Sequence, residues 1–103
     1  MSSLVRYQVA MAEALLGRRG EAVTRINKSI EDAQKEESQI SLGRALVTRA
    51  AVYAALGDAG KALDDLERAW KLPILTSGQS LRTDWRFASL AGNPRFQRLV
   101  NGE

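Results

Sequence analysis

Apolar residues recur three and four positions apart along most of the chain up to Leu72. One such stripe runs through 22–33 and a second through 62–70, and each begins just after a pair of glycines. This period places the apolar side chains on one face of a helix, whereas a half-buried strand would need strict alternation. The chain has no alternating run of β-branched residues. The pattern therefore predicts an all-α protein without a sheet.

An internal repeat organises these helices. The segment LLGRRGEAV at 15–23 returns as ALGDAGKAL at 55–63, an offset of 40. Six positions are identical at this offset: Ala10/Ala50, Ala14/Ala54, Leu16/Leu56, Gly17/Gly57, Gly20/Gly60 and Ala22/Ala62. Glycine adopts the left-handed backbone of a helix end at little cost. Each unit is therefore predicted to be two antiparallel helices around a glycine turn.

The tail has a second, shorter repeat, LRTDWRFAS followed by LAGNPRFQR, with an offset of nine residues. Asp84 and Asn93 are good helix N-caps, and Pro94 suits the first position of a helix. We predict two short helices here, about 84–91 and 94–100. Stacked repeats need their last face covered, so these helices are expected to cap the second hairpin.

Aromatic and basic residues are concentrated in this tail. Trp85, Phe87 and Phe96 stand among four arginines, a combination that also occurs where bases stack on a basic surface. Phe and Leu recur at a regular spacing of three, which favours an interior formed by the aromatic residues, with the arginines facing water. The net charge of the whole chain is only +3. Nucleic acid is therefore not an expected partner.

The predicted elements form one domain over 1–103. Its parts are a hairpin at 2–36, a second hairpin stacked on it at 39–72, a loop at 73–83 and a helical cap at 84–100. The loop includes the polar, glycine-containing segment LTSGQS at 75–80. Pro73 ends the second hairpin because proline cannot continue a helix.

Small residues stand at matched positions around each turn, and alanine there lets two helix axes approach closely. This spacing is similar to that of tetratricopeptide repeats. The segment 46–69 resembles that family at Leu46, Ala50, Tyr53, Gly57, Ala62, Leu66 and Ala69. The first unit matches at Ala10, Gly17, Ala22 and Ile26, but it has Arg6 and Glu13 where Leu46 and Tyr53 stand.

The period of the repeat, which is the spacing from Ala10 to Ala50, exceeds the roughly 34 residues usual in this family. It resembles a longer-helix variant found in bacterial regulators, and the tail is similar to the ends of such proteins. The resemblance implies a bacterial scaffold that binds other proteins. The kinase, cyclase or transcription-regulator domains to which such repeats are often attached are not present in these 103 residues.

Composition removes most catalytic chemistry. The chain has neither Cys nor His, which excludes thiolate zinc sites and nucleophiles activated by histidine. Carboxylates cluster at 31–37 and 64–67, but they alternate with lysine and arginine at helical spacing, as on a solvated helix face. We therefore expect no enzyme activity, no catalytic residues, no cofactor and no metal site.

In stacked helical hairpins, the first helices line a concave groove that binds extended or helical peptides. The predicted groove residues are Leu4, Tyr7, Gln8, Met11, Arg44, Val47, Thr48 and Ala51. Arg44 is the one charge among them, and the Lys and Asn that grip a terminal carboxylate in peptide-clamping members are missing. The prediction is a non-catalytic protein–protein interaction module that binds a peptide or helix in an apolar concave groove.

Two alternatives remain open at this point. The first helix is apolar on almost every side, and such a helix is normally buried on every side. The groove can therefore be covered by a second copy in a homodimer, or the chain can be the C-terminal part of a larger bacterial signalling or regulatory protein. No apolar run approaches the roughly 20 residues that span a bilayer, and no secretion signal is visible, so a cytoplasmic location is expected.

Overall fold

A computed structural model describes residues 2–73 and 76–102 of the chain. Four long helices come first: α1 (Ser3–Leu15), α2 (Arg19–Lys35), α3 (Gln39–Ala55) and α4 (Ala59–Trp70). Three short elements follow: α5 (Gly78–Thr83), the 3-10 helix η1 (Trp85–Leu90) and α6 (Pro94–Val100). No strand occurs in the described residues. The predicted all-α class, with two helical hairpins followed by short helices, is confirmed.

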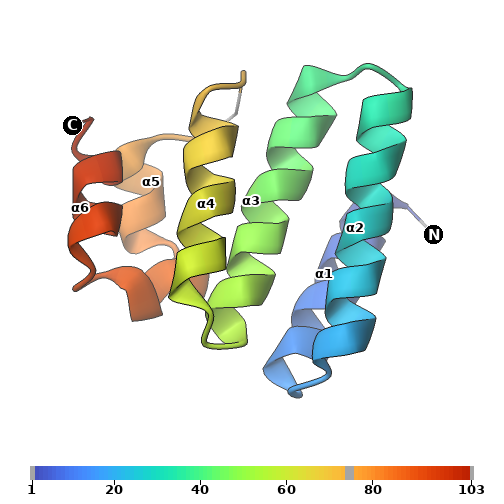
Figure 1. The fold of residues 1–103 in the computed structure, drawn as a ribbon, viewed down its shortest axis with the longest axis horizontal. Coiled ribbons are helices and arrows are strands. Elements are labelled where there is room, and N and C mark those ends of the chain that lie inside the picture. The colour runs from blue at the N-terminus through green and yellow to red at the C-terminus, as the bar shows by residue number, and fades with distance from the viewer. Residues whose placement is uncertain (1, 74–75, 103) are drawn as a thin grey trace.

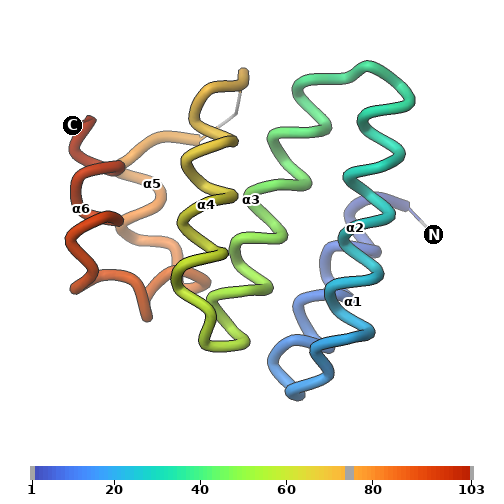
Figure 2. The backbone as a smooth tube through the Cα atoms, viewed as in Figure 1, coloured from blue at the N-terminus to red at the C-terminus, as the bar shows by residue number. Residues whose placement is uncertain are grey.

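The two hairpins stand side by side, and the short elements lie beyond α4 (Figure 1). The tube in Figure 2 shows that the chain runs alternately up and down through the four long helices. Helix α3 lies at the centre, because it packs against α1, α2, α4 and η1. The whole array measures 35 × 31 × 19 Å.

The turns follow the glycines that the repeat singled out. Gly17 and Gly57 have positive φ angles of 77° and 80°, the conformation that favours glycine at a helix end. The connection between the hairpins uses Glu37 in the same region, at φ 55°. Ser38 and Asp58 then cap α3 and α4, since each side chain accepts a hydrogen bond from a backbone amide three residues on.

The alanines that flank both turns lie in one apolar core. Ala10, Ala22, Ala50 and Ala62 are all completely buried, together with larger residues such as Leu66. Small side chains at these positions allow the helices of each hairpin to pack closely. The core also includes Phe87 and Leu90 of η1 and Phe96 of α6, so the cap continues the same apolar interior.

Two ion pairs connect α1 to α2 where the first repeat lacks apolar residues. The Arg6 guanidinium donates to Asp32 Oδ2 at 3.0 Å and to Ser29 Oγ at 3.2 Å. The Glu13 carboxylate is buried and accepts from Arg25 Nε at 2.6 Å. The charges that replace Leu and Tyr in the first unit are therefore satisfied within the hairpin.

The predicted loop at 73–83 is wrong in its second half, where α5 occupies Gly78–Thr83. The Ser77 side chain caps this helix by accepting from the Ser80 amide, and Leu81 anchors it in the core. Gly78 passes so close to the Val100 carbonyl that an added Cβ would clash with it. Residues 74 and 75, which also belong to the predicted loop, lie outside the described residues.

The cap differs from expectation in two further ways. The first predicted capping helix is a 3-10 helix, in which residues three apart share a face, so Phe87 and Leu90 point inward together. Trp85 does not share that face and is 65% exposed, so its predicted place in the interior is wrong. The arginines are not all turned to water either, because Arg95 forms ion pairs with Asp64 and Glu67 of α4.

Candidate functional site

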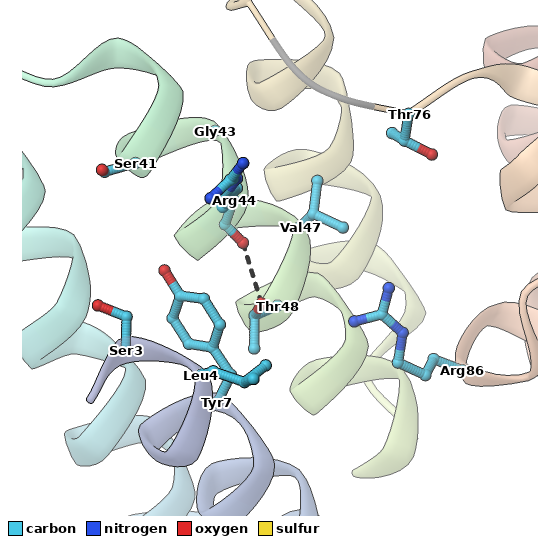
Figure 3. Close-up of a pocket in the computed structure, with 10 residues that line it drawn as sticks. All are labelled: Ser3, Leu4, Tyr7, Ser41, Gly43, Arg44, Val47, Thr48, Thr76 and Arg86. Atoms are coloured by element: carbon cyan, nitrogen blue, oxygen red, sulfur yellow. Dashed lines mark hydrogen bonds between the residues drawn. The ribbon is translucent and has the colours of Figure 1, made fainter. Parts of the chain in front are cut away.

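A pocket with a volume of about 520 Å³ opens between the start of α1, the first half of α3 and the cap (Figure 3). Its lining residues are Ser3, Leu4, Tyr7, Ser41, Gly43, Arg44, Val47, Thr48, Thr76 and Arg86. Leu4, Tyr7 and Val47 supply apolar and aromatic surface from two facing helices. The remaining residues are polar or charged, apart from Gly43, which has no side chain. The pocket therefore combines an apolar centre with a polar margin.

Five of the eight predicted groove residues meet in this pocket: Leu4, Tyr7, Arg44, Val47 and Thr48. Gln8 is exposed but does not line it. Met11 and Ala51 are buried in the core, so their predicted role in the groove is wrong. Because α1 and α3 pack directly against each other, the residues between them toward the glycine turns are covered. The open part of the groove is limited to the end away from these turns.

Half of the lining was missed from the sequence. Gly43 was detectable in principle, because a glycine inside a helix costs about 1 kcal/mol relative to alanine and marks a packing or functional need. Arg86 and Thr76 were not detectable, because only the fold of the cap brings residues from that part of the chain beside α3. Ser3 and Ser41 lie one helical turn before two residues that were predicted, Tyr7 and Arg44.

The charged side chains that line the pocket are Arg44 and Arg86, with no carboxylate among its described lining residues. Arg86 extends from the cap toward Val47 in Figure 3. Its Nε donates to Asp84 Oδ1 at 3.1 Å and its Nη2 donates to Asp84 Oδ2 at 2.7 Å, which leaves Nη1 and the second Nη2 hydrogen for other contacts. Arg44 forms no ion pair with any residue that the structure describes. The excess positive charge of the pocket therefore comes from Arg44, because Asp84 balances the charge of Arg86.

Two pKa shifts fix the charge state of this region. Burial raises the pKa of the Tyr7 hydroxyl, against the opposing effect of Arg44 and Arg6, so Tyr7 is neutral at pH 7. Burial alone would also raise the pKa of Asp84, but hydrogen bonds from Arg86 outweigh it and lower that pKa. Tyr7 can then donate a hydrogen bond, while Asp84 keeps Arg86 oriented as an ion pair.

The polar side chains at the margin differ in what they can still bind. Thr48 Oγ1 donates to the Arg44 carbonyl at 2.9 Å, as the dashed line in Figure 3 shows, so its hydroxyl hydrogen is used within α3. Ser41 Oγ accepts from Ser38 Oγ at 3.0 Å, which leaves the Ser41 hydroxyl hydrogen for another acceptor. The Tyr7 hydroxyl points toward the Arg44 end of the pocket. Donors therefore predominate at this margin.

No group of His, Cys, Asp and Glu within residues 2–73 and 76–102 is arranged to hold a metal ion. Over the same residues, no helix is both long and apolar enough to cross a membrane. No family model, curated protein or solved structure matches this chain. The resemblance to tetratricopeptide repeats therefore stays a prediction based on the residues themselves.

Proposed function

We propose that this chain is a non-catalytic protein–protein interaction module that binds a peptide or helix of a partner protein between α1, α3 and the cap. The observation that carries this proposal is the pocket of about 520 Å³, in which apolar side chains stand beside two arginines. Its size falls within the range of roughly 300–1,000 Å³ that is usual for ligand sites. It is large enough for one or two side chains of a bound segment.

A segment of a protein suits this pocket better than a small molecule. Leu4 forms one wall and is itself 66% exposed, so that wall is the open surface of a helix. A small ligand would stay largely uncovered there, whereas small-molecule sites usually bury roughly 70–90% or more of the surface of their ligand. A peptide can place one side chain in the pocket and continue along α1 or α3.

The charges of the pocket favour an acidic partner. Arg44 and Arg86 come from different elements and stand at the margin of the apolar centre formed by Leu4, Tyr7 and Val47. A guanidinium group binds a carboxylate through two parallel hydrogen bonds, which gives both strength and orientation. Arg86 already binds Asp84 in this way, so Arg44 is the arginine that offers both bonds to a partner carboxylate. The partner segment that fits best therefore has an aliphatic or aromatic side chain with Asp or Glu next to it.

The chemistry of the pocket supports the non-catalytic part of the proposal. General acid–base catalysis is most efficient with a group whose pKa lies near the working pH. The ionisable lining residues are Tyr7, whose pKa is raised further from neutrality, and two arginines, whose guanidinium groups have hydrogen-bond donors but no acceptor. The internal repeat, now seen as two equivalent hairpins, supports the tetratricopeptide-like assignment in the same proposal. A bacterial, cytoplasmic scaffold remains the setting that we propose for it.

The proposal is tested by selecting peptides from a random display library on the purified chain and measuring their binding by fluorescence anisotropy. We expect the selected peptides to share an acidic residue beside an apolar one. Val47→Asp should weaken binding by about tenfold or more, since it puts a carboxylate in the pocket beside Arg44. Ile40→Asp is the matched control, because Ile40 is an exposed aliphatic residue of α3 outside the pocket.

Chemical shifts of the wild-type protein provide a second measurement that needs no variant. Titration with a selected peptide should move the amide signals of Val47 and Thr48 more than those of α6. Failure to select any peptide, or equal binding by wild-type and Val47→Asp protein of unchanged melting temperature, would contradict the proposal.

A further inference from the structure

Helix α1 has an apolar face that packs against no other element in the described part of the chain. Val5 is 44% exposed, Leu15 is 60% exposed and Leu16 is 70% exposed, and Ala12 lies exposed between them. Val5, Ala12 and Leu16 are separated by seven and four residues, the spacing of a single helix face. Leu4, also on α1, is exposed beside the pocket, and the remaining exposed large apolar residues, Ile40 and Trp85, lie on different elements. The exposed apolar surface is therefore concentrated on α1.

The internal repeat indicates what such a face is built for. In the register that pairs Ala10 with Ala50, Val5 corresponds to Ala45 and Ala12 corresponds to Val52. Ala45 and Val52 are both completely buried, in a helix that packs against α1 and α2 of the preceding hairpin. The equivalent face of α1 thus has the composition of a helix–helix contact, but no helix of the described chain covers it.

The charges of α1 are turned away from this face. Between Ser3 and Leu15 the charged residues are Arg6 and Glu13, which pair with Asp32 and Arg25 of α2. The exposed face between those bounds therefore carries no charged side chain. An uncharged apolar face can meet an identical face without like-charge repulsion, which a charged face cannot do.

The two ends of the first hairpin carry opposite charge. Beside the start of α1 lies the acidic end of α2, where four of the residues 31–37 are carboxylates and one is lysine. At the opposite end, the turn carries Arg18 and Arg19, which are both exposed; Arg18 Nη1 lies 3.8 Å from Glu21, and Arg19 pairs with Asp58 of the second hairpin. Within the first hairpin, Glu21 thus balances one of these two cations, and the turn end is net basic by one charge. In a twofold arrangement with antiparallel α1 helices, the basic end of each copy approaches the acidic end of the other. The charge pattern is therefore complementary to itself in this orientation.

The far end of the array is closed. The 3-10 helix η1 packs against α3, and α6 packs against α4. Within the residues that the structure describes, one end of the array is thus apolar and uncovered. Two such ends can cover each other in a closed dimer, whereas a filament would need two different uncovered ends on each copy. We propose that two copies of this chain associate through the exposed face of α1 in an antiparallel, twofold-symmetric dimer. This surface is distinct from the pocket of the proposed function, apart from Leu4 at its edge.

Sedimentation velocity of the wild-type chain over a range of about 1 μM to 1 mM tests the dimer, because a single helix face is small and its affinity is expected in this range. We expect the mass to rise from monomer to dimer. The double variant Ala12→Glu/Leu16→Glu should stay monomeric throughout, with the circular dichroism of the wild type, since both side chains face solvent. Trp85→Glu, with a comparably exposed residue at the other end, should still form dimers.

The charge pattern gives a separate test of orientation. Arg18→Glu should raise the dissociation constant of the dimer about threefold or more, because it places a carboxylate near the acidic end of the other copy. A tighter dimer in this variant would overturn the antiparallel arrangement. A wild-type chain that stays monomeric at the highest concentration and binds a dye for exposed apolar surface would overturn the dimer itself. Dimer formation by the Ala12→Glu/Leu16→Glu variant would also overturn the proposed interface.

The two proposals can fail independently. The Ala12→Glu/Leu16→Glu variant leaves all residues that line the pocket unchanged, so its binding of a selected acidic peptide should equal that of the wild type. Peptide binding without dimers would therefore reject only the α1 interface, and dimers without peptide binding would reject only the pocket.

Discussion

The two hairpins have the same backbone plan but are stabilised by different chemistry. In the second hairpin, α3 and α4 meet through fully buried leucines such as Leu46 and Leu66. In the first hairpin, Arg6 occupies the position equivalent to Leu46 and pairs with Asp32 across to α2. Ile26, equivalent to Leu66, is the one large side chain in α2 that is completely buried.

This difference separates two requirements of a helical hairpin. Buried alanine occurs at the same three places in both, Ala10/Ala50, Ala14/Ala54 and Ala22/Ala62, so close approach of the helices is the shared requirement. What fills the rest of the contact can be apolar or ionic, provided that each charge is paired. Buried apolar contacts are the stronger of the two in water, because ion pairs that reach solvent contribute only about 0–1 kcal/mol.

The largest expected effect comes from replacing each of two equivalent residues, Leu46 and Arg6, by alanine, because the two hairpins differ most at this position. Leu46→Ala should lower the free energy of unfolding by about 2–5 kcal/mol, because it leaves a cavity in a closed core. Arg6→Ala at the equivalent position should cost at most about 1 kcal/mol, since Asp32 keeps its second partner, Lys28. Urea denaturation followed by circular dichroism measures both. Equal losses would mean that the hairpins do not differ as described.

Because both hairpins need a small residue where their helices approach, enlarging the equivalent residues Ala10 and Ala50 should destabilise both hairpins to a similar extent. Ala10→Leu and Ala50→Leu each add three carbon atoms at a fully buried position. Each should destabilise the protein by about 1–3 kcal/mol through overpacking. Thermal unfolding of both variants beside the wild type provides the measurement. If either substitution is neutral, close helix packing at that alanine is ruled out.

The ionic part of the first hairpin should respond to pH. The hydrogen bond from Arg25, more than burial, determines the pKa of Glu13, and it lowers that pKa in the folded state. The contribution of the ionised Glu13 carboxylate to stability is therefore complete above the ordinary Glu pKa of about 4.3. This contribution is lost as the pH falls through the lowered pKa of the folded state. Glu13→Gln should cost about 1 kcal/mol at pH 7, and much less in acid.

Denaturant midpoints of wild-type and Glu13→Gln protein across the acid range measure this loss. The matched control is Tyr53→Phe at the equivalent position of the second hairpin, which changes no group that titrates in acid. A difference between wild type and Glu13→Gln that does not depend on pH would show that the Glu13–Arg25 pair does not act through its charge.

The smallest predicted effect is a gain in stability, and it concerns Glu37 in the connection between the two hairpins. Glu37 has a φ angle of 55°, where a side chain is strained, while both hairpin turns use glycine in this conformation. Glu37→Gly should raise stability by about 0.5 kcal/mol, because the relief of strain slightly exceeds the added freedom of the unfolded chain. The same substitution at Glu36, which is in the right-handed helical region, should lower stability.

Prediction from sequence succeeded where the signal was local. The hairpins depend on glycine turns and apolar stripes that each lie within one repeat unit, and both signals are explicit in the repeat. It failed where the outcome depended on three-dimensional contact. Trp85 differs from Phe87 only in which side of a 3-10 turn faces α3, and no periodicity distinguishes the two.

The site shows the same division. Leu4, Tyr7 and Val47 were predicted because they lie on the first helices of equivalent hairpins. Met11 and Ala51 were placed there by the same reasoning, but direct packing of α1 on α3 removes them from solvent. Arg86 enters the pocket from a part of the chain that the repeat does not include, so only the folded cap reveals it.

The central position of α3 has a consequence for the order in which the array opens. Helix α3 contacts α4 of its own hairpin and both helices of the first hairpin, α1 and α2. Its Arg49 donates hydrogen bonds to Asp65 on α4 and to Asn27 on α2. Opening α3 therefore breaks both hairpins at once, whereas α1 or α6 can detach while the rest stays folded. Local unfolding should start from the two ends, so amide protons of α3 exchange with solvent last. Most contacts also join helices that are adjacent in the chain, which favours rapid refolding from α3 outward.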